Sequence, residues 1–97
     1  NVYVVQQQQP VQKIVNGVPG NVLLKPQCSA KQDVLLSGSC SAGQARDVAV
    51  GSGPDLANYS FSDPNAKASW YCEAWNYNSM SAATLSATAT CLALPVP

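Results

Sequence analysis

The chain contains four cysteines in 97 residues, and they constrain its fold more than any other feature. An even number of cysteines in so short a chain predicts two disulfides and an oxidising compartment. The competing interpretation is a zinc site, whose cysteines typically lie about two to four residues apart. Here 11, 31 and 18 residues separate successive cysteines, which favours disulfides. The cysteines are Cys28, Cys40, Cys72 and Cys91, and their spacing leaves all three pairings open.

The charge balance excludes several function classes. Five basic and five acidic residues give zero net charge, and histidine is absent. No positive field is available to bind a phosphate backbone, and no imidazole is available as a general base or metal ligand. We therefore expect no nucleic-acid partner, no metal, no cofactor and no enzymatic activity. No apolar run approaches the roughly 18 residues of a membrane span, and a chain that starts at Asn1 is expected to be a processed, secreted product.

Apolar and polar residues alternate with a period of two, which is typical of β-strands. The clearest strand is predicted over residues 84–93, with Cys91 among small apolar residues on one face and four hydroxyls on the other. Small inward residues need a bulky cover, for which Trp70 is the candidate. A second strand is predicted over residues 69–77, and residues 76–79 resemble a turn. We expect these two strands to form a hairpin.

Two shorter strands complete the predicted core of the fold. One covers residues 33–37, with Val34 and Leu36 on its inward side, and the other covers residues 46–50. Residues 51–67 carry glycine and proline turn signals, so we expect a loop there. The fold class is therefore all-β: a small, disulfide-stapled β-sandwich, with a small barrel as the alternative.

The N-terminal segment, residues 1–21, differs from the disulfide-bonded domain predicted over residues 22–97. Short valine-rich pieces flank a glutamine run that Pro10 is expected to end, and Asn16-Gly17 is a favoured hairpin turn. All four cysteines follow this segment, so no disulfide ties it to the domain. An edge strand, a strand exchanged between subunits and a loose arm are all open. If exchanged, the strand would fill pockets of its neighbour with the side chains of Val2, Val4, Val11 and Val15.

Four short motifs occur in order along the chain. They are Cys28-Ser29-Ala30, Leu-Leu-Ser-Gly-Ser-Cys at residues 35–40, Trp-Tyr-Cys-Glu-Ala-Trp-Asn at residues 70–76, and Ala-Thr-Ala-Thr-Cys at residues 87–91. This series resembles a small β domain of bacterial secreted and surface proteins, which often follows a collagen-like or other fibrous stalk. Ser29 and Lys31 stand where that family has Pro and Gly. The resemblance implies the disulfides Cys28–Cys91 and Cys40–Cys72.

An aromatic row on the predicted strand 69–77 is the main candidate binding surface. Tyr71, Trp75 and Tyr77 share the face opposite Cys72, with Glu73 between them as an acceptor. Exposed aromatic side chains can stack on sugar rings or bury against another protein. Large apolar groups lie on both faces of this strand, however, which favours the alternative that the row belongs to the core of a sandwich.

The remaining candidate sites have simpler explanations. Asp55 and Asp63 could form a carboxylate pair, and together with Asn58 and Asn65 they could bind calcium, but these residues also suit turns. A serine–lysine pair using Lys25, Lys31 or Lys67 lacks a supporting motif. Asn58-Tyr59-Ser60 is a sequon for N-glycosylation in a secreted protein.

We expect an extracellular structural subunit that self-assembles into a pilus-like filament or a surface layer through its N-terminal strand. A head-to-tail contact of that kind forms filaments because it does not close on itself. The alternative is a surface-displayed, adhesin-like binding head that recognises a glycan or host ligand through its aromatic strand face.

Overall fold

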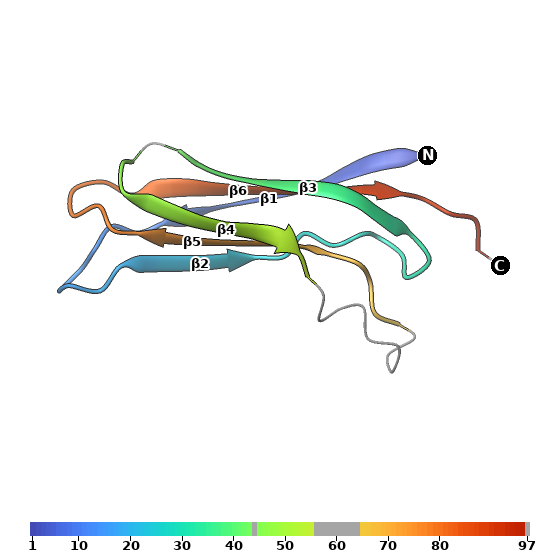
Figure 1. The fold of residues 1–97 in the computed structure, drawn as a ribbon, viewed down its shortest axis with the longest axis horizontal. Coiled ribbons are helices and arrows are strands. Elements are labelled where there is room, and N and C mark those ends of the chain that lie inside the picture. The colour runs from blue at the N-terminus through green and yellow to red at the C-terminus, as the bar shows by residue number, and fades with distance from the viewer. Residues whose placement is uncertain (44, 56–64, 97) are drawn as a thin grey trace.

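Two three-stranded antiparallel sheets face each other in the computed structural model, which describes residues 1–43, 45–55 and 65–96 (Figure 1). One sheet has the order β1-β6-β3 and the other the order β2-β5-β4. Both sheets end in open edges, so the fold is the expected small sandwich and not a barrel. The strands are β1 (Val2–Val11), β2 (Gly20–Leu24), β3 (Val34–Gly43), β4 (Val48–Pro54), β5 (Trp70–Asn76) and β6 (Ala83–Leu92).

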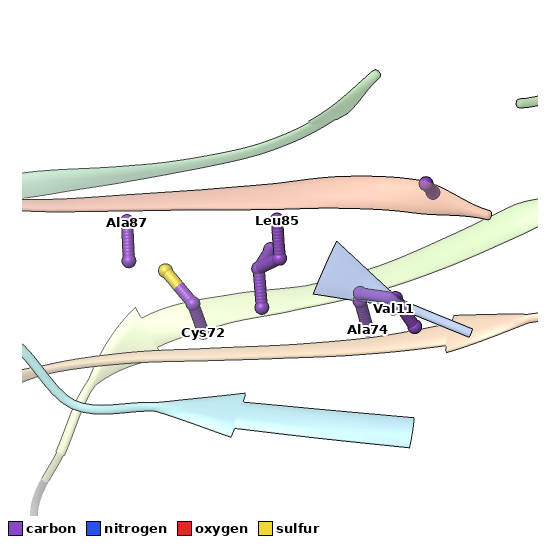
Figure 2. Packing of buried hydrophobic residues seen from close by; sticks show 6 residues of the cluster. Val11, Cys72, Ala74, Leu85 and Ala87 are labelled. Carbon is purple, nitrogen blue, oxygen red and sulfur yellow. The ribbon is translucent and has the colours of Figure 1, made fainter. Parts of the chain in front are cut away.

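The core lies between the two central strands, β5 and β6. Leu85 and Ala87 project from β6 toward Cys72 and Ala74 of β5, and Val11 of β1 completes this cluster (Figure 2). All five side chains are fully buried. The strict alternation of buried and half-buried residues along β6 confirms the face predicted from the sequence.

Trp70 covers the small residues of β6, as the sequence predicts. Its indole packs against both core clusters, and its Nε1 donates a hydrogen bond to Ser52 Oγ at 3.0 Å. The ring also lies directly against Gly38 of β3. A Cβ atom at that position would lie 2.1 Å from the indole Cγ, so only glycine leaves room for the ring.

The predicted hairpin of the last two strands is wrong. β5 and β6 belong to different sheets and pack face to face, because each presents an inward row of small residues to the other. Hydrogen bonds of two asparagine side chains stabilise the connection that leads from β5 in one sheet to β6 in the other. Asn76 is fully buried and donates to the carbonyls of Val11 at 3.1 Å and Ser81 at 3.0 Å. Asn78 accepts from the backbone N–H of Ser81 at 2.8 Å.

β1 is one continuous strand where the sequence predicts two short strands broken by the glutamine run. All ten residues of β1, including the glutamines and Pro10, pair with β6. Polar side chains are compatible with this position because β1 lies at a sheet edge, where half of the strand is solvated. In this structure β1 thus takes the edge-strand arrangement, paired with β6 of its own chain.

Two further expectations fail for local reasons. A β-bulge between Leu35 and Ser37 reverses the alternation in β3, so Val34 and Leu36 point outward and Leu35 packs inward. Residues 51–54 continue β4 instead of forming a turn. The glycines do not interrupt the strand, and the rings of Tyr71 and Trp75 of β5 cover one of them, Gly51, on the outer face of the sheet.

The disulfides join Cys28 to Cys91 and Cys40 to Cys72, the pairing that the resemblance implies. The second bond connects β3 to β5 and so links the two sheets. The predicted turn at Asn16-Gly17 is also present, with φ angles of 52° and 78° that suit these two residues. No disulfide involves β1, which only non-covalent contacts hold.

Candidate functional site

The open edge of β1 is the first candidate surface. Ala93 donates its N–H to the carbonyl of Asn1 at 2.8 Å, which sets the register of the ladder. Since hydrogen-bonded pairs alternate in an antiparallel ladder, odd-numbered residues of β1 bond to β6 and even-numbered residues direct their N–H and C=O groups away from it. Pro10 falls in the even set, where its missing N–H costs no bond to β6. The outward set is Val2, Val4, Gln6, Gln8 and Pro10.

The four valines predicted to act together in assembly do not share a face. Val2 and Val4 lie on the outer face of β1 and are 61% and 55% exposed. Val11 is fully buried in the core, and Val15 lies after β1, where it forms an isolated bridge with Val18. A neighbour at this edge would therefore meet the β1 backbone, Val2 and Val4.

The three strands of this sheet carry no charge. β1, β3 and β6 contain no charged residue, and their outer face presents amides and hydroxyls. Ser39 and Thr88 share a hydrogen bond at 2.6 Å, and Gln8 Nε2 donates to Ser86 Oγ at 3.4 Å. An open hollow of about 250 Å³ lies between β1 and β6, lined by Gln6, Gln7, Gln8, Ser86, Ala87 and Thr88.

Hydrogen bonds of the Tyr3 side chain connect β1 to the segment that precedes β3. Its hydroxyl donates to Asp33 and accepts from the backbone N–H of Ser29 at 2.7 Å. Asp33 also accepts from the backbone N–H of Leu94 at 3.2 Å. The hydrogen bond from Tyr3, supported by those from backbone N–H groups, holds the pKa of Asp33 below its usual value, against the opposing effect of burial. The sequence analysis did not identify this contact, because Tyr3 and Asp33 lie in different segments.

The aromatic row lies on the outer face of the sheet β2-β5-β4, so the alternative that it forms core is wrong. Tyr71 and Trp75 are half-buried, and both rings extend over Gly51 of the neighbouring strand β4. A Cβ atom at Gly51 would lie 3.8 Å from Trp75 Cζ3 and 3.8 Å from Tyr71 Cε1. Tyr77 follows the end of β5 and is 51% exposed.

Glu73 lies between the two rings and is held by its neighbours. It accepts a hydrogen bond from the Tyr71 hydroxyl and another from Asn21 Nδ2 at 3.0 Å. These bonds, that from Tyr71 first, hold the pKa of the Glu73 carboxyl below its usual value. The same hydrogen bond raises the pKa of Tyr71, with a further contribution from burial. Neither group therefore changes its charge near neutral pH.

An ion pair joins the residues that directly follow β2 and β4. Lys25 Nζ lies 3.3 Å from Asp55 Oδ2, and Ser69 Oγ donates to the same carboxylate at 3.3 Å. The charge of Lys25 is thus neutralised locally. Asp55 belongs to the predicted carboxylate pair and calcium site, and here it serves as the partner of Lys25.

The other predicted sites fall partly on residues that the structure does not describe. Asn58 and Asp63 lie outside the described residues, so the sequon, the carboxylate pair and the calcium set cannot be placed. Within residues 1–43, 45–55 and 65–96, no three acidic or cysteine side chains gather as a metal site would require. That same part of the chain contains no helix with the length and apolar character needed to cross a membrane.

The residues that support the aromatic face were not predicted from the sequence. Ala49, Gly51 and Gly53 face outward on β4 and leave space for the rings, while Asn21 on β2 orients Glu73. The alternation of small residues from Ala49 to Gly53 was a usable signal, because a strand may carry glycines where aromatic side chains of a neighbouring strand cover them.

Comparisons with known proteins give no assignment: no family model matches the chain, and neither a curated protein nor a solved structure matches it.

Proposed function

We propose that this chain is an extracellular structural subunit that self-assembles into a filament or surface layer through β1. The observation that carries the proposal is the open edge of β1, where the backbone groups of alternate residues face away from β6. Long, uncharged edge strands readily pair with another chain, and natural proteins usually protect such edges with charges, bulges or prolines. On β1 only Pro10 protects the edge, and it lies near the strand end.

The edge of β3 is the best complement for β1 in a neighbouring subunit. It terminates the same sheet on the opposite side and is also uncharged. Pairing β1 of one subunit with β3 of the next would continue the sheet β1-β6-β3 from subunit to subunit. Such a contact joins two different surfaces, so it generates an open filament when the rotation between subunits does not close a ring.

The edges of the second sheet are poorer candidates. β2 has five residues and β4 has seven, whereas β1 and β3 have ten each. A short edge strand offers fewer backbone groups for pairing with another chain. The contrast between the two sheets supports assembly through the sheet that contains β1.

Two disulfides support the extracellular part of the proposal, because such bonds persist in oxidising compartments. The zero net charge is compatible with close packing of many copies, since no overall repulsion opposes it.

The first test removes one hydrogen-bond donor from the open edge. In the Gln6→Pro variant the missing N–H faces away from β6, so pairing within the subunit is kept while pairing with a neighbour is interrupted. We expect wild-type filaments in negative-stain micrographs and a monomer for Gln6→Pro. Gln6→Ala, which keeps the N–H, is the matched control and should assemble. A Gln6→Lys/Gln8→Lys variant places two positive charges at the same edge. These charges should also disfavour pairing with a neighbouring subunit.

The proposal fails if the wild-type protein stays monodisperse at high concentration. It also fails if both Gln6→Pro and Gln6→Lys/Gln8→Lys assemble as the wild type does. Circular dichroism and the thermal midpoint of each variant establish that the subunit itself is folded.

A second test separates edge pairing from strand exchange. Val4 and Thr90 are directly opposite in a pair without hydrogen bonds, where Cα atoms are about 4.5 Å apart and a disulfide can form. The Val4→Cys/Thr90→Cys variant therefore locks β1 onto its own β6. We expect the locked protein to assemble, because the open edge remains. If the lock abolishes assembly and Val4→Cys alone does not, β1 is exchanged between subunits.

A further inference from the structure

A second surface of the molecule has the chemistry of a sugar-binding platform. It consists of Tyr71, Glu73 and Trp75 on β5, with Asn21 on β2 and Gly51 on β4, and it lies on the sheet that does not contain β1. We propose that this aromatic face binds a neutral glycan. The inference does not depend on the proposed self-assembly, because the two surfaces belong to different sheets.

The two rings provide the apolar part of the site. Both extend over Gly51, whose lack of a side chain lets them approach the β4 backbone. One side of each ring is thus supported by the sheet, and the half-exposed aromatic surface can stack on the C–H face of a pyranose. From Tyr71 to Trp75 the strand rises by roughly 14 Å, which favours a chain of sugar units over a single ring.

The polar part of the site offers unused hydrogen-bonding atoms at the ring edges. Within the described residues, Trp75 Nε1 and Asn21 Oδ1 have no hydrogen-bond partner, and both residues are accessible to solvent. Sugar hydroxyls can accept from the indole N–H and donate to the amide oxygen. The Glu73 carboxylate, oriented by Tyr71 and Asn21, adds a charged acceptor between the two rings.

The charges of this face favour a neutral ligand over an anionic one. Glu73 is ionised at neutral pH, and its lowered pKa keeps it so in mild acid. Lys25 is paired with Asp55, so its positive charge is already compensated. A sulfated or carboxylated sugar would therefore meet like charge at the centre of the site.

Space for the ligand is available on the β4 side. A Cβ atom at Gly53 would have no other atom within 4 Å. Gly53 is opposite Tyr71 in the sheet, so this open space lies beside the Tyr71 ring. A side chain introduced there can obstruct the platform while the packing of the sheet is unchanged.

The test is isothermal titration calorimetry with cellohexaose and chitohexaose, which are neutral, and a heparin hexasaccharide, which is anionic. We expect the wild-type protein to bind a neutral oligosaccharide in preference to heparin. Trp75→Ala should weaken that binding about tenfold or more, because it removes one stacking ring. Gly53→Val should weaken binding while keeping both rings and the wild-type thermal midpoint. Leu36→Ala, an exposed apolar residue of the other sheet, is the matched control and should bind as the wild type does.

Four results would overturn the inference. The first is the absence of binding to both neutral oligosaccharides at millimolar concentration. The second is binding that both Trp75→Ala and Gly53→Val leave unchanged, and the third is tighter binding of heparin. The fourth is a dimer that Trp75→Ala disrupts in the absence of sugar binding, which would assign the face to a second copy of the chain. If Trp75→Ala does not fold, Gly53→Val decides the question alone.

Discussion

The hydroxyl of Tyr3 donates a hydrogen bond to the carboxylate of Asp33 and so joins β1 to the segment that leads into β3. No disulfide links β1 to the domain, and this contact lies at the end of the strand near which both chain ends are found (Figure 1). An ionised group therefore contributes to holding this end of β1, beside the ladder with β6.

The contact predicts that acid loosens β1. The pKa of Asp33 is lower in the folded than in the unfolded protein, whose ordinary value is 3.8. The stabilisation is complete above that ordinary value and is lost as the pH falls through the lowered pKa of the folded protein. We expect amide exchange of β1 to accelerate below about pH 4 before that of β5. In Tyr3→Phe the thermal midpoint should fall less steeply with acid; parallel curves for the two proteins would contradict this, and Tyr77→Phe is the control.

The contact between Trp70 and Gly38 predicts that alanine substitutions at two glycines of β3 have very different effects on stability. Gly38→Ala would place a Cβ 2.1 Å from the indole and should destabilise the fold by about 1–3 kcal/mol through overpacking. Gly43→Ala meets no atom within 4 Å and should be neutral or slightly stabilising. Urea unfolding of both variants checks the difference. Equal stabilities would show that Trp70 can move aside at no cost.

Because the amide of Asn76 is buried and hydrogen-bonded, we expect its removal to lower the free energy of unfolding substantially. Asn76→Ala leaves the carbonyl of Val11 and the N–H of Asn78 without their partner, and should cost about 2–4 kcal/mol. Asn21→Ala removes an exposed amide and should cost much less. Chemical denaturation measures the free energy of unfolding of both variants, provided that their m-values equal that of the wild type. A cost for Asn76→Ala no greater than for Asn21→Ala would mean that water replaces its hydrogen bonds.

The two disulfides should contribute almost equally to stability despite their different loop lengths. Their sequence separations are 63 and 32, and in the chain-entropy model the contribution grows only with the logarithm of loop length, giving about 4 kcal/mol for each. Each pair is removed by replacing both cysteines with alanine, and the free energy of unfolding is measured in urea. A difference of more than about 2 kcal/mol between the two variants would point to effects in the folded state beyond loop entropy.

The sequence predicts which residues face inward better than it predicts which strands are neighbours. The alternation around Leu85 and Cys91 determines a buried face, because a strand directs successive side chains to opposite sides. Alternation contains no information about the partner of that face. For this reason β5 and β6 were expected to pair as a hairpin, although they pack across the sandwich.

The remaining errors concern residues whose structure or exposure is determined by their position in the sheet and not by their residue type. The glutamine run and Pro10 suggest an interruption, yet both are tolerated in β1 because an edge strand has one solvated side. Leu36 is apolar but exposed, because the bulge at that residue adds one position to β3. The aromatic face was identified from Tyr71 and Trp75, whereas the room for its rings depends on Gly51 of another strand.

The bond between Cys28 and Cys91 also has a mechanical consequence. A tensile force applied between the two ends of the chain would pass along the N-terminal segment to Cys28, cross the disulfide to Cys91 and leave through the last residues. Once β1 has separated from β6, the disulfide would carry this load in place of residues 29–90. Extension would be limited mainly to the 27 residues before Cys28, roughly 90 Å of stretched chain. A subunit under tension would therefore yield first by peeling β1 from β6, while its crosslinked core keeps its shape.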